Sequence, residues 1–398
     1  MAKSGKSRLK DLLLVIVLVV LVAGAAHFAI TNPLGPSRLL YHAQAQVIQW
    51  TTACTSDAPA WMAKAQRYAT RNMAAHASQL AYVSPEGQLH HCETGWKDGF
   101  WGSEKLSADT RFRFASTTKT LTAAAVIDLV NKNQLGLSDS IVDVLGLEGD
   151  PRDPRINDIT IGHLLTHRAG WDRERTQDVM FKMNHKPWCP EEPEQLLNAG
   201  LMYDPGETEL YSNLGYCLLG LAIEKVTGQP YRDYMADRYE FADSTLAFID
   251  GPFQPDEVEY DFRFENFYSS RYHQAFDFPA LSSAAGLSGR ASDLARLVSN
   301  ALKAKPLSIL DGNRGEQCTP AQMQACYGYG LYRYLPEGAE MPLYLHGGKL
   351  PANPSVIAVD PHGGVLVWLG ASGPRPDGNP TQAFYDYLQG VLANHYDR

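Results

Sequence analysis

Hydrophobic and polar residues form three patterns along the chain, and each pattern predicts a different kind of element. Residues 12–26 contain no polar side chain, and the apolar run extends to Ile30. In the middle of the chain, segments such as 159–167 and 215–228 repeat apolar residues at helical spacing, and Gly228 is a typical helix stop. Towards the C-terminus, short apolar or alternating runs bounded by Gly and Pro are typical of strands.

The predicted strands lie near both ends of the chain, and the predicted helices fill its centre. A helical segment at 58–75 precedes a hairpin whose strands run to Val83 and through Cys92. Four more strands are expected before a final helix, in the sequences YGYGLYRYL, PLYLHGG, NPSVIAVDP and GGVLVWLGA. We therefore expect an α+β fold. Its antiparallel sheet is formed by the N- and C-terminal segments, flanked by helices, with a mostly helical region inserted at about 115–302.

The apolar N-terminal run follows a short basic segment, as in membrane anchors and secretory signals. Residues 12–30 would span roughly 28 Å as a helix, about the thickness of a bilayer core. The basic flank is expected in the cytoplasm, so the rest of the chain is exported. Ala23-Gly24-Ala25 resembles a signal-cleavage site, but the apolar stretch continues past it. We favour an uncleaved anchor in the inner membrane, facing the periplasm, over secretion to the periplasm after cleavage.

The chain divides into three parts on this interpretation. Residues 1–31 form the cytoplasmic flank and the anchor or signal segment, 32–56 form a tether, and 57–398 form the folded domain. Two stretches of that domain, 172–198 and 251–280, have the composition of surface insertions. The formal net charge of −9 argues against a nucleic-acid partner, which usually needs a basic face.

Six cysteines in an exported chain permit disulfide bonds. Six cysteines allow about fifteen connectivities, among which we favour Cys318 with Cys326 because they flank a short loop. Cys54 with Cys92 is a second candidate pair. Cys217 lies in an apolar helical stretch and is interpreted as a buried thiol. The chain has no C-x-x-C spacing, so we expect neither a zinc site nor a redox site.

The first candidate chemistry lies in the sequence FASTTKTLTAAAVIDLV, where Ser116 and Lys119 stand three residues apart. On a helix such residues share a face, with Cβ atoms about 5–6 Å apart. The lysine amine can then assist the serine hydroxyl, which is a weak nucleophile until a base takes its proton. The alternative is that Ser116 is an ordinary helix cap, and this spacing alone does not exclude it.

Two further motifs supply groups that such a nucleophile needs. Tyr211 and Asn213 precede a predicted helix; a tyrosine can take a proton, and an asparagine amide can hold a substrate carbonyl. His346-Gly347-Gly348 ends a predicted strand, where glycines allow a substrate backbone to lie along the edge. Taken singly, these residues could equally be packing, a cap and a turn.

The three motifs in this order resemble the class C β-lactamase-like serine hydrolases, which include esterases, D-aminopeptidases and penicillin-binding carboxypeptidases. The sequences ITIGHLLTHRAGW, YDPGETELYSNLGYCLLGLAIEKVTGQPY and SSAAGLSGRASDLARL also look like segments of that family, in the family's order. The resemblance covers about residues 81–369.

The resemblance implies a role for each motif. Ser116 would be the acylated nucleophile, and Lys119 and Tyr211 would exchange its proton, with the general base unassigned between them. Asn213 would orient the substrate. The backbone N–H groups of Ser116 and Lys349 would form the oxyanion hole. No cofactor would be needed, and the partner would be a small ester, amide or peptide substrate.

One position departs from the family pattern. His346 stands where β-lactamases and most carboxypeptidases have the lysine of Lys-Thr-Gly, and a neutral histidine does not attract a carboxylate. Lys349 could partly replace that charge. We rank ester or amide hydrolysis first and a β-lactamase or DD-carboxypeptidase second; a non-catalytic β-lactam or peptidoglycan sensor is the alternative of another class. His163 and His167 form H-x-x-x-H without the glutamate of a zinc protease and are expected on a core helix.

Overall fold

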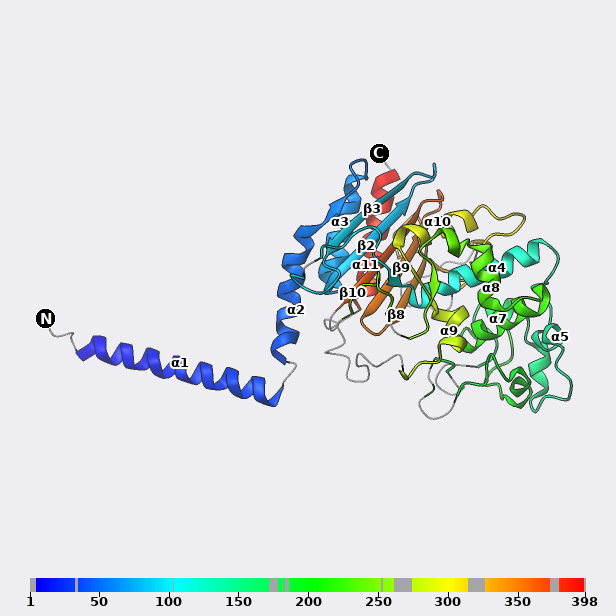
Figure 1. Ribbon diagram of the computed structural model, residues 1–398, viewed down its shortest axis with the longest axis horizontal. Coiled ribbons are helices and arrows are strands. Elements are labelled where there is room, and N and C mark those ends of the chain that lie inside the picture. Colours follow the sequence, from blue (N-terminus) through cyan, green and yellow to red (C-terminus); the bar gives the residue numbers. More distant parts are fainter. Residues whose placement is uncertain are drawn as a thin grey trace.

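A seven-stranded antiparallel sheet forms the centre of the molecule (Figure 1). The computed structural model describes residues 5–32, 35–102, 104–171, 178–180, 182, 186–251, 253–260, 274–313, 326–372 and 379–396. The strand order β1-β3-β2-β10-β9-β8-β7 places N-terminal strands beside C-terminal strands, which confirms the predicted fold class. The strands are β1 (Ala53–Cys54), β2 (Ala75–Val83), β3 (Leu89–Gly95), β7 (Tyr332–Tyr334), β8 (Leu343–Leu350), β9 (Asn353–Val359) and β10 (Val365–Ser372).

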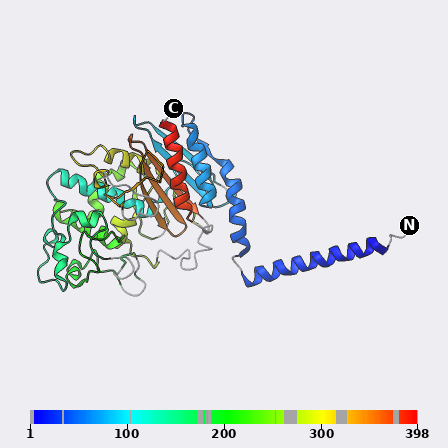
Figure 2. The same ribbon diagram turned by 180° about the vertical axis from the view of Figure 1, so that it is seen from behind.

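Helices cover both faces of this sheet because the central strands are apolar on both sides. In β10, Val367 and Leu369 face one hydrophobic core, whereas Leu366 and Trp368 face the other. This alternation follows from the two-residue period of a strand. The second core lies under α3 (Ala60–Asn72) and α11 (Pro380–Tyr396), which run side by side (Figure 2). The first core lies under α10 (Ala291–Ala301) and the central helical region.

The predicted helical region lies against one face of the sheet (Figure 1). Three of its helices pack on one another: α4 (Thr118–Asn131), α7 (Asn213–Thr227) and α9 (Phe278–Ala285). α7 ends at Gly228, whose left-handed φ of 70° is the helix stop expected from the sequence. The remaining named elements are α5 (Ile141–Leu145), α6 (Ile161–Leu165), α8 (Tyr231–Arg238), and the small sheet of β4 (Phe112–Arg113), β6 (Leu287–Gly289) and β5 (Ala247–Phe248).

The segment expected to be a tether, residues 32–56, is largely folded instead. Helix α2 (Gly35–Ile48) packs on α3, and its Tyr41, Ala45 and Ile48 are buried. These residues repeat at helical spacing, a signal that the sequence prediction overlooked. Strand β1 follows α2 and pairs with β3.

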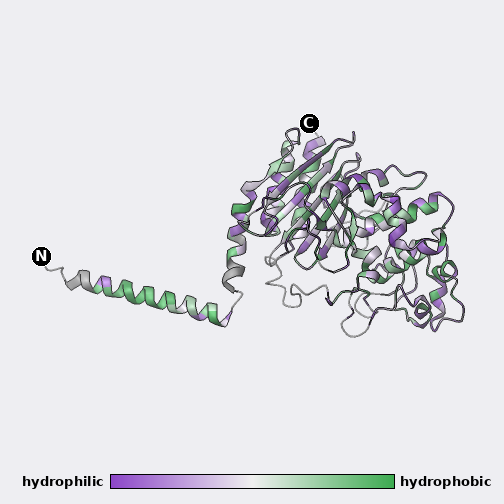
Figure 3. Cartoon of the chain, in the orientation of Figure 1, coloured by the Kyte–Doolittle hydropathy of each residue, from purple (hydrophilic) through white to green (hydrophobic). Residues whose placement is uncertain are grey.

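Helix α1 (Gly5–Thr31) carries the apolar N-terminal run and extends away from the rest of the fold (Figure 3). Its segment Leu9–Thr31 is long and apolar enough to cross a membrane, and it is not buried against the protein. An N-terminal apolar helix of this kind fits a signal anchor or a signal peptide.

Two disulfide bonds join described residues. Cys54–Cys92 links β1 to β3 and confirms one candidate pair. Cys189–Cys217 corrects the interpretation of Cys217 as a buried thiol, because a loop distant in sequence brings Cys189 to the surface of α7. The favoured Cys318–Cys326 pair lies outside the described residues, since Cys318 does. Two disulfides indicate an oxidising compartment such as the periplasm.

Candidate active site

Ser116 lies in a 3₁₀ turn, Ala115–Thr117, that connects β4 to α4. The cap positions of the turn and of α4 are Phe114 and Thr117, so Ser116 does not occupy the capping position considered as its alternative role. Ala115 has a φ of 51°, in the left-handed region that a residue with a Cβ seldom adopts. The turn therefore holds Ser116, which is half-buried, at the start of α4.

Strand β8 passes directly beside the backbone of this turn. A Cβ atom at Gly348 would lie 2.9 Å from the Ser116 nitrogen and 2.8 Å from the Phe114 carbonyl oxygen, closer than real Cβ contacts. The same carbonyl accepts a 2.6 Å hydrogen bond from the Ser355 hydroxyl of β9. The second glycine of His346-Gly347-Gly348 is therefore required by the close approach of strand and turn.

Lys119 contacts two other predicted site residues. Its Nζ is buried and donates hydrogen bonds to Asn213 Oδ1 at 2.7 Å and to the Ala284 carbonyl at 2.9 Å. The same nitrogen lies 4.8 Å from the centroid of the Tyr211 ring, within the range of a cation–π interaction. The ammonium group therefore lies between α4, α7 and α9, in contact with the predicted Tyr-x-Asn motif.

Asp178 is a member of the site that the sequence did not identify. Asn213 Nδ2 donates to Asp178 Oδ1 at 3.1 Å, while Asn213 Oδ1 accepts from Lys119. An ammonium group can only donate and a carboxylate only accept, so these partners fix the orientation of the amide. Asp178 falls in the segment 172–198, where no periodicity or motif distinguished it from the surrounding polar residues.

His346 is fully buried and is held in one tautomer. Its Nδ1 lies 2.8 Å from the Gly330 carbonyl oxygen and must donate to it, which leaves Nε2 without the proton. Burial is the main cause that lowers the pKa of His346 to about 3. The hydrogen bond to Gly330 acts against this shift, and the Lys119 charge adds to it. The imidazole is therefore neutral at pH 7, as expected from the sequence. The Lys349 side chain, three residues further along β8, is exposed.

Three further tyrosines lie in this part of the fold: the Tyr216 ring centroid is 5.4 Å from Lys119 Nζ, the Tyr327 hydroxyl is hydrogen-bonded to Tyr216, and Tyr332 packs on Tyr327. Burial raises the pKa of the Tyr327 and Tyr332 phenols well above their usual range, and raises that of Tyr216 as well. These three phenols therefore stay neutral and cannot act as bases near neutral pH. The Tyr211 ring, which lies beside Lys119, is half-buried.

The two histidines of H-x-x-x-H have separate environments. His163 is in α6, where its Nδ1 accepts from the Thr160 backbone in a capping box. His167 follows the end of α6 at Leu165, which corrects the expectation that both lie on one core helix. Among the residues that the structure describes, no group of three or more His, Cys, Asp or Glu side chains could hold a metal ion.

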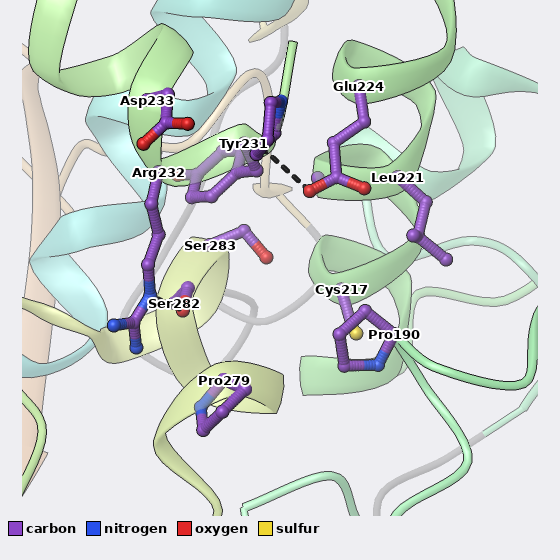
Figure 4. A pocket seen from close by; sticks show the side chains of 12 residues that line it. Pro190, Cys217, Leu221, Glu224, Tyr231, Arg232, Asp233, Pro279, Ser282 and Ser283 are labelled. Atoms are coloured by element: carbon purple, nitrogen blue, oxygen red, sulfur yellow. Dashed lines mark hydrogen bonds between the residues drawn. The ribbon is translucent and has the colours of Figure 1, made fainter.

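A cavity of about 280 Å³ lies beside α9, between α7 and α8 (Figure 4). Its walls include Pro279, Ser282 and Ser283 of α9, and Tyr231 of α8. The next residue of α9 is Ala284, whose carbonyl accepts from Lys119. None of the predicted site residues lines this described cavity, so it is distinct from the group around Ser116.

The fold and the arrangement of these residues define a serine-hydrolase fold of the β-lactamase and transpeptidase type. The family model described as Beta-lactamase matches residues 65–390. The chain belongs to the Beta-lactamase family. This confirms the resemblance seen in the sequence.

The relatives of this chain carry several different names. It is 37% identical over 364 residues to a putative fimbrial assembly protein FimD, serogroup D, from Dichelobacter nodosus, covering 91% of this chain and 92% of that protein. It is 30% identical over 163 residues to penicillin-binding protein 4* from Bacillus subtilis (strain 168), covering 37% of this chain and 32% of that protein. The first name gives no chemical activity.

Solved structures share the fold at lower sequence identity. D-amino acid amidase from Ochrobactrum anthropi SV3, complexed with L-phenylalanine amide, is 20% identical with a TM-score of 0.64, covering 81% of this chain and 94% of that one. The octameric penicillin-binding protein homologue from Pyrococcus abyssi is 21% identical with a TM-score of 0.62, covering 83% of this chain and 77% of that one. These likenesses establish the architecture.

Proposed function

We propose that this protein is a serine hydrolase that cleaves an ester or amide through an acyl-enzyme intermediate on Ser116. The observation that carries the proposal is the buried Lys119 ammonium group, hydrogen-bonded to Asn213 and packed against the Tyr211 ring. These groups come from motifs almost a hundred residues apart in the sequence. They meet one helical turn from Ser116, at the start of α4.

Each proposed step conserves protons. Ser116 Oγ attacks the substrate carbonyl while its proton passes to the Lys119 and Tyr211 pair, and that proton then goes to the departing alcohol or amine. Water next attacks the acyl group, gives one proton to the pair, and releases the acid as the Ser116 hydroxyl forms again. A cation beside a phenol favours the phenolate, so Lys119 lowers the cost of using Tyr211 as the base.

The oxyanion hole is assigned to the backbone N–H groups of Ser116 and Lys349. The close approach of β8 to the Ser116 backbone, which Gly348 permits, supports this assignment. Preorganised donors of this kind are effective because they already point to where negative charge develops, and removing one costs about 10²–10³ in rate.

The charge of the site favours substrates that lack a carboxylate at the position facing His346. The neutral His346 cannot supply the charge-assisted contact that a lysine would give. Ester or amide hydrolysis, of the esterase or D-aminopeptidase kind, is therefore proposed first. The family membership keeps a second candidate, β-lactamase or DD-carboxypeptidase activity, for which exposed Lys349 could supply a charge.

The place of action is proposed to be the periplasmic face of the inner membrane. The apolar α1 supports an uncleaved single-pass anchor, and the two disulfides support an oxidising compartment. A fusion of alkaline phosphatase to the C-terminus should be active and should stay in the membrane fraction after carbonate extraction. An inactive fusion would contradict the proposed orientation.

A substrate panel tests the proposed function. Purified full-length protein is given p-nitrophenyl acetate, p-nitrophenyl butyrate, D-alanine amide and a chromogenic cephalosporin, beside the Ser116→Ala variant. We expect steady turnover of an ester or the amide, slow or no turnover of the cephalosporin, and loss of all activity in the variant. A burst of one product equivalent without turnover would instead favour the sensor, and unchanged activity in Ser116→Ala would refute the nucleophile.

A further inference from the structure

His167 holds the backbone on both sides of Tyr211. Its carbonyl oxygen accepts a 2.8 Å hydrogen bond from the Leu210 N–H, and its Nδ1 accepts a 3.3 Å hydrogen bond from the Ser212 N–H. One residue thus binds the backbone nitrogens before and after Tyr211. Because Asn213 follows directly, these bonds also fix the start of α7.

The imidazole of His167 also supports the Tyr211 ring. The two ring centroids lie 4.4 Å apart, and a second neighbour, Tyr327, has its centroid 4.4 Å from the imidazole as well. The His167 side chain is only 3% exposed, so solvent does not separate it from either ring. A flat side chain at this position limits where the Tyr211 phenol can lie.

The backbone conformation of His167 is unusual. Its φ is 57°, in the left-handed region that asparagine, aspartate and histidine enter more readily than most residues. Such conformations cost energy and persist where the surroundings determine them. Here the strained backbone directs both the carbonyl and the imidazole towards the segment that carries Tyr211.

The hydrogen bond from Ser212 defines the protonation state of His167. Nδ1 accepts, so the single proton of the neutral ring is on Nε2. Burial is the main cause that lowers the pKa of His167 well below 6.5. The nearby Lys119 of α4 and His346 of β8 lower this pKa further, in that order. The other titratable groups against the ring are the phenols of Tyr211, Tyr216 and Tyr327. The acceptor on Nδ1 is therefore present throughout the neutral pH range.

We infer that His167 is a positioning residue for Tyr211, which it holds by two backbone hydrogen bonds and one ring contact so that the phenol stays beside Lys119. The catalytic effect of this placement rests on the proposed function, whereas the position of the Tyr211 ring can be measured separately. His167 acts through Tyr211 and does not contact the substrate. Misplacing a catalytic group by about 1 Å can cost on the order of 10² in rate.

Three variants test this role. His167→Ala removes the ring and the Nδ1 acceptor and should lower kcat for p-nitrophenyl acetate about 10²-fold with KM unchanged within twofold. His167→Asn tolerates the left-handed backbone and offers an amide oxygen to the Ser212 N–H, so it should recover at least tenfold of that loss. His163→Asn, four residues earlier on α6 with its imidazole bonded to the Thr160 backbone, is the matched control and should keep wild-type kcat.

A second readout does not depend on catalysis. The ¹⁹F spectrum of 3-fluorotyrosine at position 211 should give one narrow line in wild type, His163→Asn and His167→Asn, and a shifted or broadened line in His167→Ala. An unchanged line in folded His167→Ala would overturn the inference, as would His167→Ala retaining kcat within threefold. If wild type neither hydrolyses esters nor labels at Ser116, the proposed function fails, and the ¹⁹F comparison still decides whether His167 positions Tyr211.

Discussion

Lys119 is the cation around which the other polar side chains of the site are arranged. Its Nζ donates to Asn213 Oδ1 and to the Ala284 carbonyl and lies 4.8 Å from the centroid of the Tyr211 ring. After burial, the positive charge of Lys119 is a further cause that lowers the pKa of both His167 and His346. Burial and this ammonium group together keep both histidines neutral.

A substitution at Gly348 tests the contact between β8 and the Ser116 backbone. Gly348→Ala would place a methyl group against the Ser116 nitrogen and the Phe114 carbonyl, and backbone atoms cannot yield as a flexible side chain can. We expect the rate of p-nitrophenyl acetate hydrolysis to fall by about 10² or more, because one oxyanion donor is displaced. Gly200→Ala is the matched control, since a Cβ there meets no atom within 4 Å. Equal rates in the two variants would contradict the described contact.

His346 tests the origin of substrate choice. His346→Lys replaces a neutral ring by a flexible cation and should raise kcat/KM for a carboxylate-bearing cephalosporin by about tenfold or more, the effect of one charge-assisted hydrogen bond. The exposed His362→Lys adds the same charge elsewhere and should have no effect. Failure of folded His346→Lys to improve cephalosporin turnover, while it still hydrolyses esters, would show that this position does not control carboxylate binding.

At the scale of elements, the sequence predicts what periodicity determines and misses what tertiary contacts determine. β9, β10, α7 and α11 have strong apolar patterns and lie where expected. Ser116, Lys119, Tyr211 and Asn213 can be proposed from the sequence because they occur in motifs. Asp178 and the Cys189–Cys217 bond join segments that are distant in sequence and carry no local signal, so only the folded chain reveals them.

The Cys189–Cys217 bond ties the loop after Asp178 to the helix that begins with Asn213. Replacing both cysteines by alanine should lower the free energy of unfolding by about 2–4 kcal/mol and also reduce kcat, because the Asp178–Asn213 contact loses its restraint. The matched control is Cys54→Ala with Cys92→Ala, which removes the covalent link between β1 and β3 at the far edge of the sheet from β8 and should change stability but not kcat. Urea unfolding and ester kinetics measure both; equal kcat in the two double variants would contradict the coupling.

At the scale of the whole molecule, the site exists only when distant parts of the chain meet. The N-terminal strands β2 and β3 complete the sheet in which the C-terminal β8 and β9 contact the Ser116 turn. The inserted helices then supply Lys119 and Asn213 from the same side of that sheet. Global unfolding and loss of the site should therefore coincide.

Buried neutral histidine makes the fold sensitive to acid. Above pH 6.5 His346 is unprotonated in both the folded and the unfolded chain, so it does not make the free energy of unfolding depend on pH. Below pH 6.5 the unfolded chain binds a proton that the folded chain excludes until about pH 3, so stability falls as pH falls through this window.

His346→Asn removes this titrating side chain and should reduce the pH dependence of the free energy of unfolding. From pH 7.5 to 4.5 the wild-type free energy of unfolding should drop by roughly 2–3 kcal/mol more than that of the variant. Urea midpoints at the two pH values measure the difference. The exposed His362→Asn should behave as wild type, and equal drops in wild type and His346→Asn would contradict a buried neutral His346.

The most direct test of the account is the site of covalent labelling by a fluorophosphonate, read by peptide mass mapping on the full-length protein. The account predicts one adduct on Ser116, none in Ser116→Ala, and labelling slowed by about 10² or more in Lys119→Met, whose side chain has similar length without the amine. An adduct that persists in Ser116→Ala, or wild-type labelling rates in Lys119→Met, would contradict it.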